Sequence, residues 1–165
     1  MADRTNILVG PAEVFVDGTS VGWTEGGVEV EKSVDTFEKE VDQHFDALDI
    51  VATKWTLTVR TAFAEATLEN LKIAWNETST IQAGPPKRLG IGLQQEIPEH
   101  QLEFVGPGPN GTNRRYRFWR AKLVGSSGHG YKKDDKVIFP VEFRVLPDEN
   151  KTEDERYGEV LDEQP

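Results

Sequence analysis

The 165-residue sequence contains no cysteine, and this absence excludes thiol nucleophiles, disulfide bonds and thiolate metal sites. Long apolar runs are missing too, since none approaches the roughly 20 residues that a membrane-spanning helix needs. The opening Met1-Ala-Asp-Arg-Thr-Asn6 has neither the basic nor the apolar region of an export signal. We therefore expect a protein that carries no export signal and has no membrane contact.

Catalytic signatures are also lacking. The sequence has no His-Glu-x-x-His zinc motif, no Gly-x-Ser-x-Gly nucleophile turn and no phosphate-binding glycine loop. Asp42, His44 and Asp46, with Asp49 nearby, offer the oxygen and imidazole ligands that a divalent cation accepts. Their spacing by two places them on one face of a strand, with no loop to surround a metal. We interpret them as a solvated or intersubunit face, and we predict neither an enzyme nor a cofactor nor a metal site.

Basic residues are few, and the formal net charge is −10. The acidity is concentrated after residue 147, where eight acidic residues face two basic ones. A chain of this charge disfavours general binding to nucleic acid or anionic lipid, because each phosphate contact needs a lysine or an arginine. The composition instead favours a surface to which DNA does not adhere.

A sharp change of hydrophobic period marks the middle of the chain. Residues 55–63 alternate between apolar and polar side chains, the period of two that a half-buried strand imposes. Leu68, Leu71 and Ala74 then follow at spacings of three, which places them on one face of a helix over about residues 65–77. The pattern predicts a strand that leads directly into a single docking helix.

The rest of the chain has the pattern of short strands separated by glycine-rich and proline-rich loops. We expect further strands at the chain start and, after the helix, over residues 89–93, 101–105, 116–124 and 136–146. This predicts a mainly β fold, a sandwich or barrel with one flanking helix, over residues 1–147. Residues 148–165 are expected to be a flexible acidic arm, in which residues 157–161 add a strand once a partner is present.

Two charged stretches are candidates for contacts between copies. The segment at about 27–50 is expected to leave the domain as an extended arm, with the candidate contact residues Val28, Glu29, Glu31, Asp35, Glu38, Asp42 and Gln43. A basic strand carries Arg114, Arg115, Arg117 and Arg120 between aromatic residues. Such a strand can bind nucleic acid, but we favour one whose aromatics enter the core while its arginines face acidic surface. We also hypothesise that it pairs with the acidic arm of a neighbouring copy.

The first half of the chain resembles a known family. The residues that carry the resemblance are Val9-Gly-Pro-Ala-Glu-Val-Phe-Val16, Val21-Gly-Trp-Thr-Glu-Gly-Gly-Val28, Val41-Asp-Gln43 and the strand leading into Ala64-Glu-Ala-Thr-Leu-Glu-Asn-Leu71. Together they are similar to the tail tube (major tail) protein of long-tailed bacteriophages with non-contractile tails. The second half has a similar layout of strands and loops without a diagnostic motif.

The resemblance implies a structural virion protein, located in the tail and assembled in the host cytoplasm. It implies hexameric rings whose inner strands form one barrel, stacked into a hollow tube that conducts DNA without binding it specifically. Implied partners are other copies of the chain, the tape measure protein, the tail terminator and the distal tail proteins. Thr56, Thr58 and Arg60 are then candidates for a face toward the lumen or a neighbouring subunit. Contractile-tail inner tubes and the type VI secretion tube are related in fold.

One alternative function is that of a secretion-system tube subunit. The other is a β-sandwich module that binds carbohydrate or protein. Its stacking platform would be one of the four tryptophans, Trp23, Trp55, Trp75 or Trp119. The last three have periodic apolar neighbours and are expected in the core, whereas Trp23 lies next to a turn. Assembly into rings or tubes, as against a monomer that retains a glycan, separates the two functions.

Overall fold

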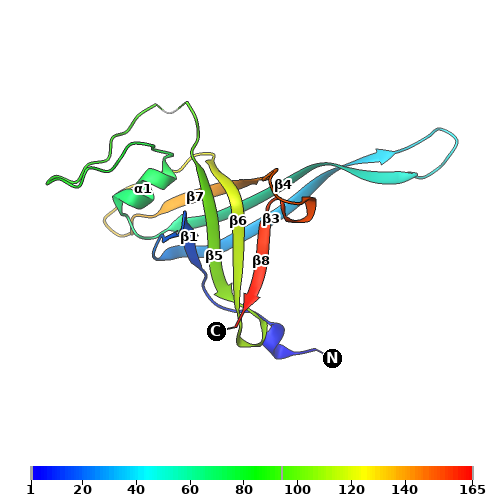
Figure 1. Cartoon of the computed structure of the whole chain (residues 1–165), viewed down its shortest axis with the longest axis horizontal. Helices are drawn as coiled ribbons and strands as arrows, with labels where there is room; N and C mark the ends of the chain where they lie inside the picture. Colours follow the sequence, from blue (N-terminus) through cyan, green and yellow to red (C-terminus); the bar gives the residue numbers. More distant parts are fainter. Residues whose placement is uncertain (1, 94, 165) are drawn as a thin grey trace.

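The computed structural model describes residues 2–93 and 95–164 and shows a mainly β protein with one α-helix (Figure 1). In these ranges the strands are β1 (Glu13–Val16), β2 (Thr19–Ser20), β3 (Thr24–Lys39), β4 (Asp49–Phe63), β5 (Glu99–Pro107), β6 (Asn113–Val124), β7 (Phe139–Leu146) and β8 (Gly158–Glu163). The helix is α1 (Leu68–Ala74), and short 3-10 turns cover Arg4–Asn6, Pro109–Gly111 and Glu153–Glu155. The predicted fold class, mainly β with one helix and a long arm, is confirmed.

The strands form one antiparallel sheet in the order β2-β1-β5-β6-β7-β4-β3, with β8 paired to β6. One edge of β6 pairs with β5, whereas its other edge pairs first with β8 and then with β7. This change of partner falls at Trp119, between the pairs Phe118↔Gly158 and Arg120↔Leu146. The sheet folds over at β6, so that β5, β6 and β8 cross over β3, β4 and β7 (Figure 1). The two layers of the sandwich therefore belong to a single continuous sheet.

The core lies between these two layers. Alternate residues of β4 and β7 point into it, among them Val59, Phe63 and Phe143, and side chains of β5 and β6 such as Leu102 and Leu123 meet them. Each of these five side chains is at most 2% exposed, so nearly all of their apolar surface is removed from water. The alternation of buried and half-buried residues along β7 is the pattern of a sheet with one covered face.

The predicted junction between strand and helix is confirmed, with different bounds. The strand begins at Asp49, earlier than expected, and the helix is shorter than residues 65–77. The Thr67 hydroxyl accepts a hydrogen bond from the Asn70 backbone N–H at 3.2 Å, which caps the helix start. At the other end, Asn76 adopts a left-handed φ of 57°, and the Glu77 N–H donates to the Lys72 carbonyl at 2.9 Å. This closing motif ends the helix at Ala74.

The expected arm is a β-hairpin. Strands β3 and β4 pair from Thr24↔Phe63 out to Lys39↔Asp49, and the outer part projects far beyond the sandwich (Figure 1). Residues 40–48 form its tip. Because β4 continues from the hairpin into the core, the arm is a direct extension of the central sheet.

Two sequence predictions are wrong. Residues 89–93 form no strand and lie in the long loop between α1 and β5. A strand was expected over residues 157–161 only with a partner, but residues 158–163 fold back as β8 on β6 of the same chain, so this part of the tail is not a free arm. No helix within residues 2–93 and 95–164 is long and apolar enough to cross a bilayer.

Candidate assembly surfaces

The hairpin tip, residues 40–48, is acidic and unusually apolar for a solvent-exposed loop. Phe45 is fully exposed, and Leu48 and Val41 are at least 43% exposed. Phe37 and Ile50, on the strands next to the tip, are each at least 59% exposed. Between residues 38 and 49, five carboxylates stand against Lys39, which pairs with Asp49 at 3.5 Å. Several apolar side chains gathered on one projecting element mark an interaction site. The tip is therefore the first candidate assembly surface.

The structure divides the seven predicted arm residues between the two ends of the hairpin. Val28 packs against the core, and the carboxylates of Glu29 and Glu31 lie 3.7 and 3.1 Å from the Arg60 guanidinium. Asp35, Glu38, Asp42 and Gln43 are exposed on the projecting part. At the tip itself, the His44 ring contacts the Asp46 backbone carbonyl at 3.1 Å, and the part of the chain that is described contains no cluster of three metal-ligating side chains.

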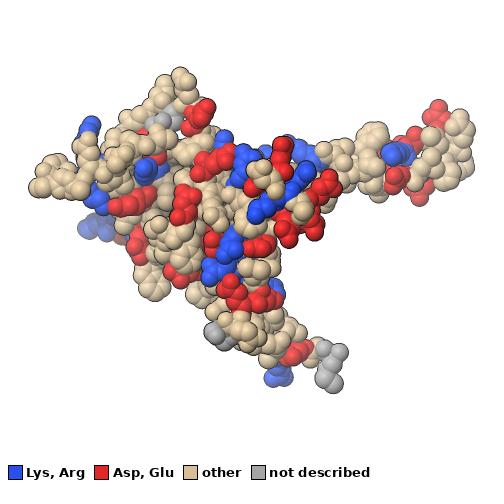
Figure 2. Space-filling view, viewed as in Figure 1, with Lys and Arg blue, Asp and Glu red and all other residues tan. Residues whose placement is uncertain are grey.

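The four arginines of the basic strand lie on β6 and are paired within the chain. Arg114 meets Asp162 at 2.7 Å, and Arg120 meets Glu99 at 2.6 Å. Arg115 binds Glu103 and Glu163, and Arg117 binds Glu103 and Glu159. Figure 2 shows the resulting interleaved charges over β6 and β8. The interpretation in which arginines face acidic surface is the observed arrangement, because the chain's own tail supplies much of that surface.

These pairs shift the titration of their members. The hydrogen bond from Arg114 holds the pKa of Asp162 below its usual value, and the same bond raises the pKa of Arg114. Arg120 likewise lowers the pKa of Glu99 by hydrogen bonding to it. The carboxylates stay ionised, and the basic strand presents little free positive charge to phosphate or to another acidic segment.

Thr56, Thr58 and Arg60 lie on the face of β4 that points away from the core, and Thr58 is buried there, at 8% exposure. Across the sheet the same face carries Glu29, Glu31, Glu142 and Arg144, directly opposite Arg60 or Thr58 in register. The hydrogen bonds that Arg60 donates to the Glu31 and Glu142 carboxylates raise its pKa. We use the name outer face for the set formed by Thr56, Thr58, Arg60, Glu29, Glu31, Glu142 and Arg144. It is polar, and its three carboxylates outnumber its two arginines.

The tryptophans divide differently from the expectation. Trp75 packs against the core, and Trp119 is half-buried, with its indole N–H donating to the Glu155 carbonyl at 2.7 Å. Trp55 was expected in the core, but it is 47% exposed because it lies on the hairpin beyond the second sheet layer. The Lys32 ammonium lies over its ring at 4.9 Å. Trp23 is 79% exposed, beside a groove of about 460 Å³.

A surface that the sequence did not suggest lies between the hairpin base and the C-terminal segment. This groove of about 650 Å³ is lined by apolar parts of Val30, Trp55, Tyr116, Phe118, Tyr157 and Val160. We call it the C-terminal groove. It exists only because the tail folds back as β8, so no local sequence pattern could have indicated it.

Comparison with solved structures gives a similar chain, whereas the searches by sequence give none. No protein-family model and no curated protein matches the sequence. A chain in the cryo-EM structure of the anti-feeding prophage (AFP) baseplate, determined with six-fold symmetry, is similar in fold. The TM-score is 0.57 at 9% sequence identity, and the match covers 98% of both chains. The likeness extends over the whole chain and concerns the fold.

Proposed function

We propose that this chain is a structural subunit of a phage-type tail particle, assembling with copies of itself into rings that stack as a hollow tube. The observation that carries the proposal is the hairpin, an extension of the core sheet that projects exposed apolar side chains into solvent. A free monomer gains nothing from exposing Phe45, Leu48 and Ile50 together, whereas a neighbouring subunit can cover them. The full-length fold similarity to a chain of a six-fold-symmetrised baseplate structure supports the same class.

The unpaired edges of the sheet agree with this function. β3 spans 16 residues and, within the described part of the chain, pairs on one side only, with β4. A long open edge leaves backbone N–H and C=O groups that can pair with another chain. In a closed ring each such edge pairs with the neighbouring subunit, which makes the contact specific. In the proposed particle, the DNA passes through the lumen without specific contacts. Tail terminator, tape measure and distal tail proteins are its proposed partners.

Cryo-EM of the purified protein at increasing concentration tests the proposal. Stacked rings or tubes are the expected result. Single rings that never stack would instead assign the subunit to a baseplate, the kind of assembly in which the similar chain was determined. A monomer that persists at millimolar concentration would overturn the proposal.

A second candidate, a carbohydrate-binding module, is favoured by Trp23, whose exposed ring borders a groove. A flat aromatic surface beside a groove suits stacking on a sugar ring. Glycan-array binding by the wild type, lost in Trp23→Ala while the protein stays monomeric, would support this function. Assembly of Trp23→Ala into the same rings as the wild type would support the tube.

A further inference from the structure

The C-terminal groove combines an apolar floor with an acidic rim. The rim includes the 3-10 turn Glu153–Glu155 that precedes β8, and its three consecutive carboxylates have no ion-pair partner in the described part of the chain. Glu159 adds a fourth carboxylate and Lys32 and Arg156 add two cations, so the lining carries more negative than positive charge. A hydrogen bond from the Thr152 side chain lowers the pKa of Asp154, so this carboxylate is ionised at neutral pH. The groove therefore suits a segment that joins an apolar or aromatic side chain to positive charge.

The loop between β6 and β7 carries such a segment. Tyr131 is 87% exposed, and Lys132 and Lys133 follow it without a carboxylate partner among the described residues. A backbone bridge between Lys132 and Asp135 closes the loop into a turn, and Lys136 is held by Glu25 at 2.8 Å. The turn thus presents an aromatic ring and two ammonium groups that are unpaired among the described residues, and Asp134 and Asp135 follow them in the sequence.

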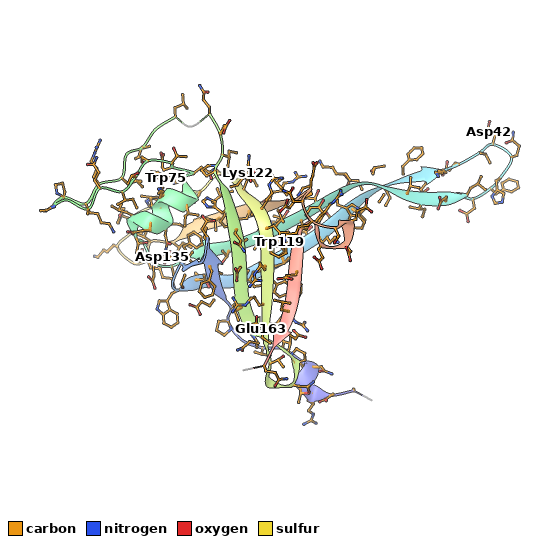
Figure 3. All side chains as sticks on the ribbon, viewed as in Figure 1. Asp42, Trp75, Trp119, Lys122, Asp135 and Glu163 are labelled. Carbon is orange, nitrogen blue, oxygen red and sulfur yellow. The ribbon has the colours of Figure 1, made fainter. Side chains whose placement is uncertain are left out.

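The groove and this loop lie on different sides of the molecule. In Figure 1 the turn before β8 lies on the hairpin side of the sandwich, and Figure 3 places Asp135 of the loop beside α1 on the other side. One copy cannot bring its own loop to its own groove. Two different surfaces that fit each other make a heterologous contact, which propagates from copy to copy until a ring closes.

We propose that Tyr131, Lys132 and Lys133 of one copy occupy the C-terminal groove of the next. Tyr131 covers the apolar floor at Trp55 and Val160, and the two lysines pair with the carboxylates of the rim. This inference rests on the proposed function, because it names one of the contacts by which subunits join. It also gives β8 a second role, since the strand that neutralises the basic strand builds one wall of the groove.

Disulfide trapping tests the contact directly, because the wild-type chain has no cysteine. Tyr131→Cys and Val160→Cys proteins are mixed under mild oxidation. A disulfide forms only when the two Cα atoms approach within about 7 Å. We expect a disulfide-linked heterodimer in the mixture, at least tenfold more abundant than either homodimer. The control pairs Tyr131→Cys with Val9→Cys, which is 86% exposed and lies outside the groove, and no excess of heterodimer is expected.

Charge exchange gives an independent readout. Lys132→Glu/Lys133→Glu and Glu153→Lys/Glu155→Lys should each raise the concentration needed for assembly at least tenfold, because like charges then meet at the rim. A single chain with all four changes should regain most of this loss. Glu96→Lys, which alters charge on another loop, should have little effect.

The outcomes separate this inference from the proposed function. Rings that form while the Tyr131→Cys and Val160→Cys proteins give no excess of heterodimer would refute the contact and leave the tube standing. A heterodimer without rings would support the contact and refute the tube. Absence of both, or occupation of the groove by a different virion protein in the assembled particle, would overturn the inference.

Discussion

Two phenylalanines of this chain have opposite environments, and their truncation separates folding from assembly. Phe143 is fully buried between the two sheet layers, whereas Phe45 is fully exposed at the hairpin tip. Phe143→Ala should lower the free energy of unfolding by about 3–5 kcal/mol, since it removes a ring from a packed core and leaves a cavity. Phe45→Ala should change it by less than about 0.5 kcal/mol yet weaken self-assembly. Urea denaturation and sedimentation velocity measure the two effects. Equal stability losses would contradict the assigned burial.

Asp162 gives a prediction about pH. Its pKa is lowered in the folded chain by Arg114, so its contribution to stability is present above the unfolded pKa of about 3.9 and is lost as pH falls through the lower, folded value. We expect amide exchange in β8 to accelerate below about pH 4 in the wild type. Asp162→Asn should show faster exchange in β8 already at pH 7 and a smaller change on acidification. A wild-type β8 that stays protected at pH 2 would refute this role of the pair.

The hairpin tip is an element that the monomer does not need. Residues 40–48 connect the last paired residues, Lys39 and Asp49, so an Asn-Gly turn can replace them and still close the hairpin. The shortened protein should keep the urea midpoint of the wild type, because the tip contributes nothing to the buried core. It should fail to form rings or tubes in cryo-EM. Normal tubes from the shortened chain would remove the tip from the assembly contacts.

Elements with a strong local period were predictable, and those defined by distant pairing were not. The strand ending at Phe63 and the helix after Thr67 follow from alternation and capping within a short window. β8 has a weak apolar pattern in an acidic tail, and it is stabilised by arginines that lie 42 to 48 residues earlier. The sequence feature that could have indicated β8 is the match of charges between two distant segments, because the antiparallel register aligns the acidic residues of β8 with the arginines of β6. Trp55 shows the opposite failure, in which a local pattern predicts burial that does not occur. The alternation of apolar and polar residues continues along β4 to Trp55, but the second sheet layer no longer covers the strand there.

For the whole molecule, the net charge of −10 and the outer face lead to a prediction about the bore. If the outer face lines the lumen, Glu29 and Glu31 repel passing DNA and offset Arg60 and Arg144. Glu29→Lys/Glu31→Lys converts this face to net positive charge, so assembled tubes should retain double-stranded DNA in co-sedimentation at about 50 mM salt and release it at about 200 mM. Glu29→Gln/Glu31→Gln should retain less. The matched control, Glu96→Lys/Glu149→Lys, makes the same change in net charge on other surfaces. Equal retention by the control would place the outer face elsewhere in the particle.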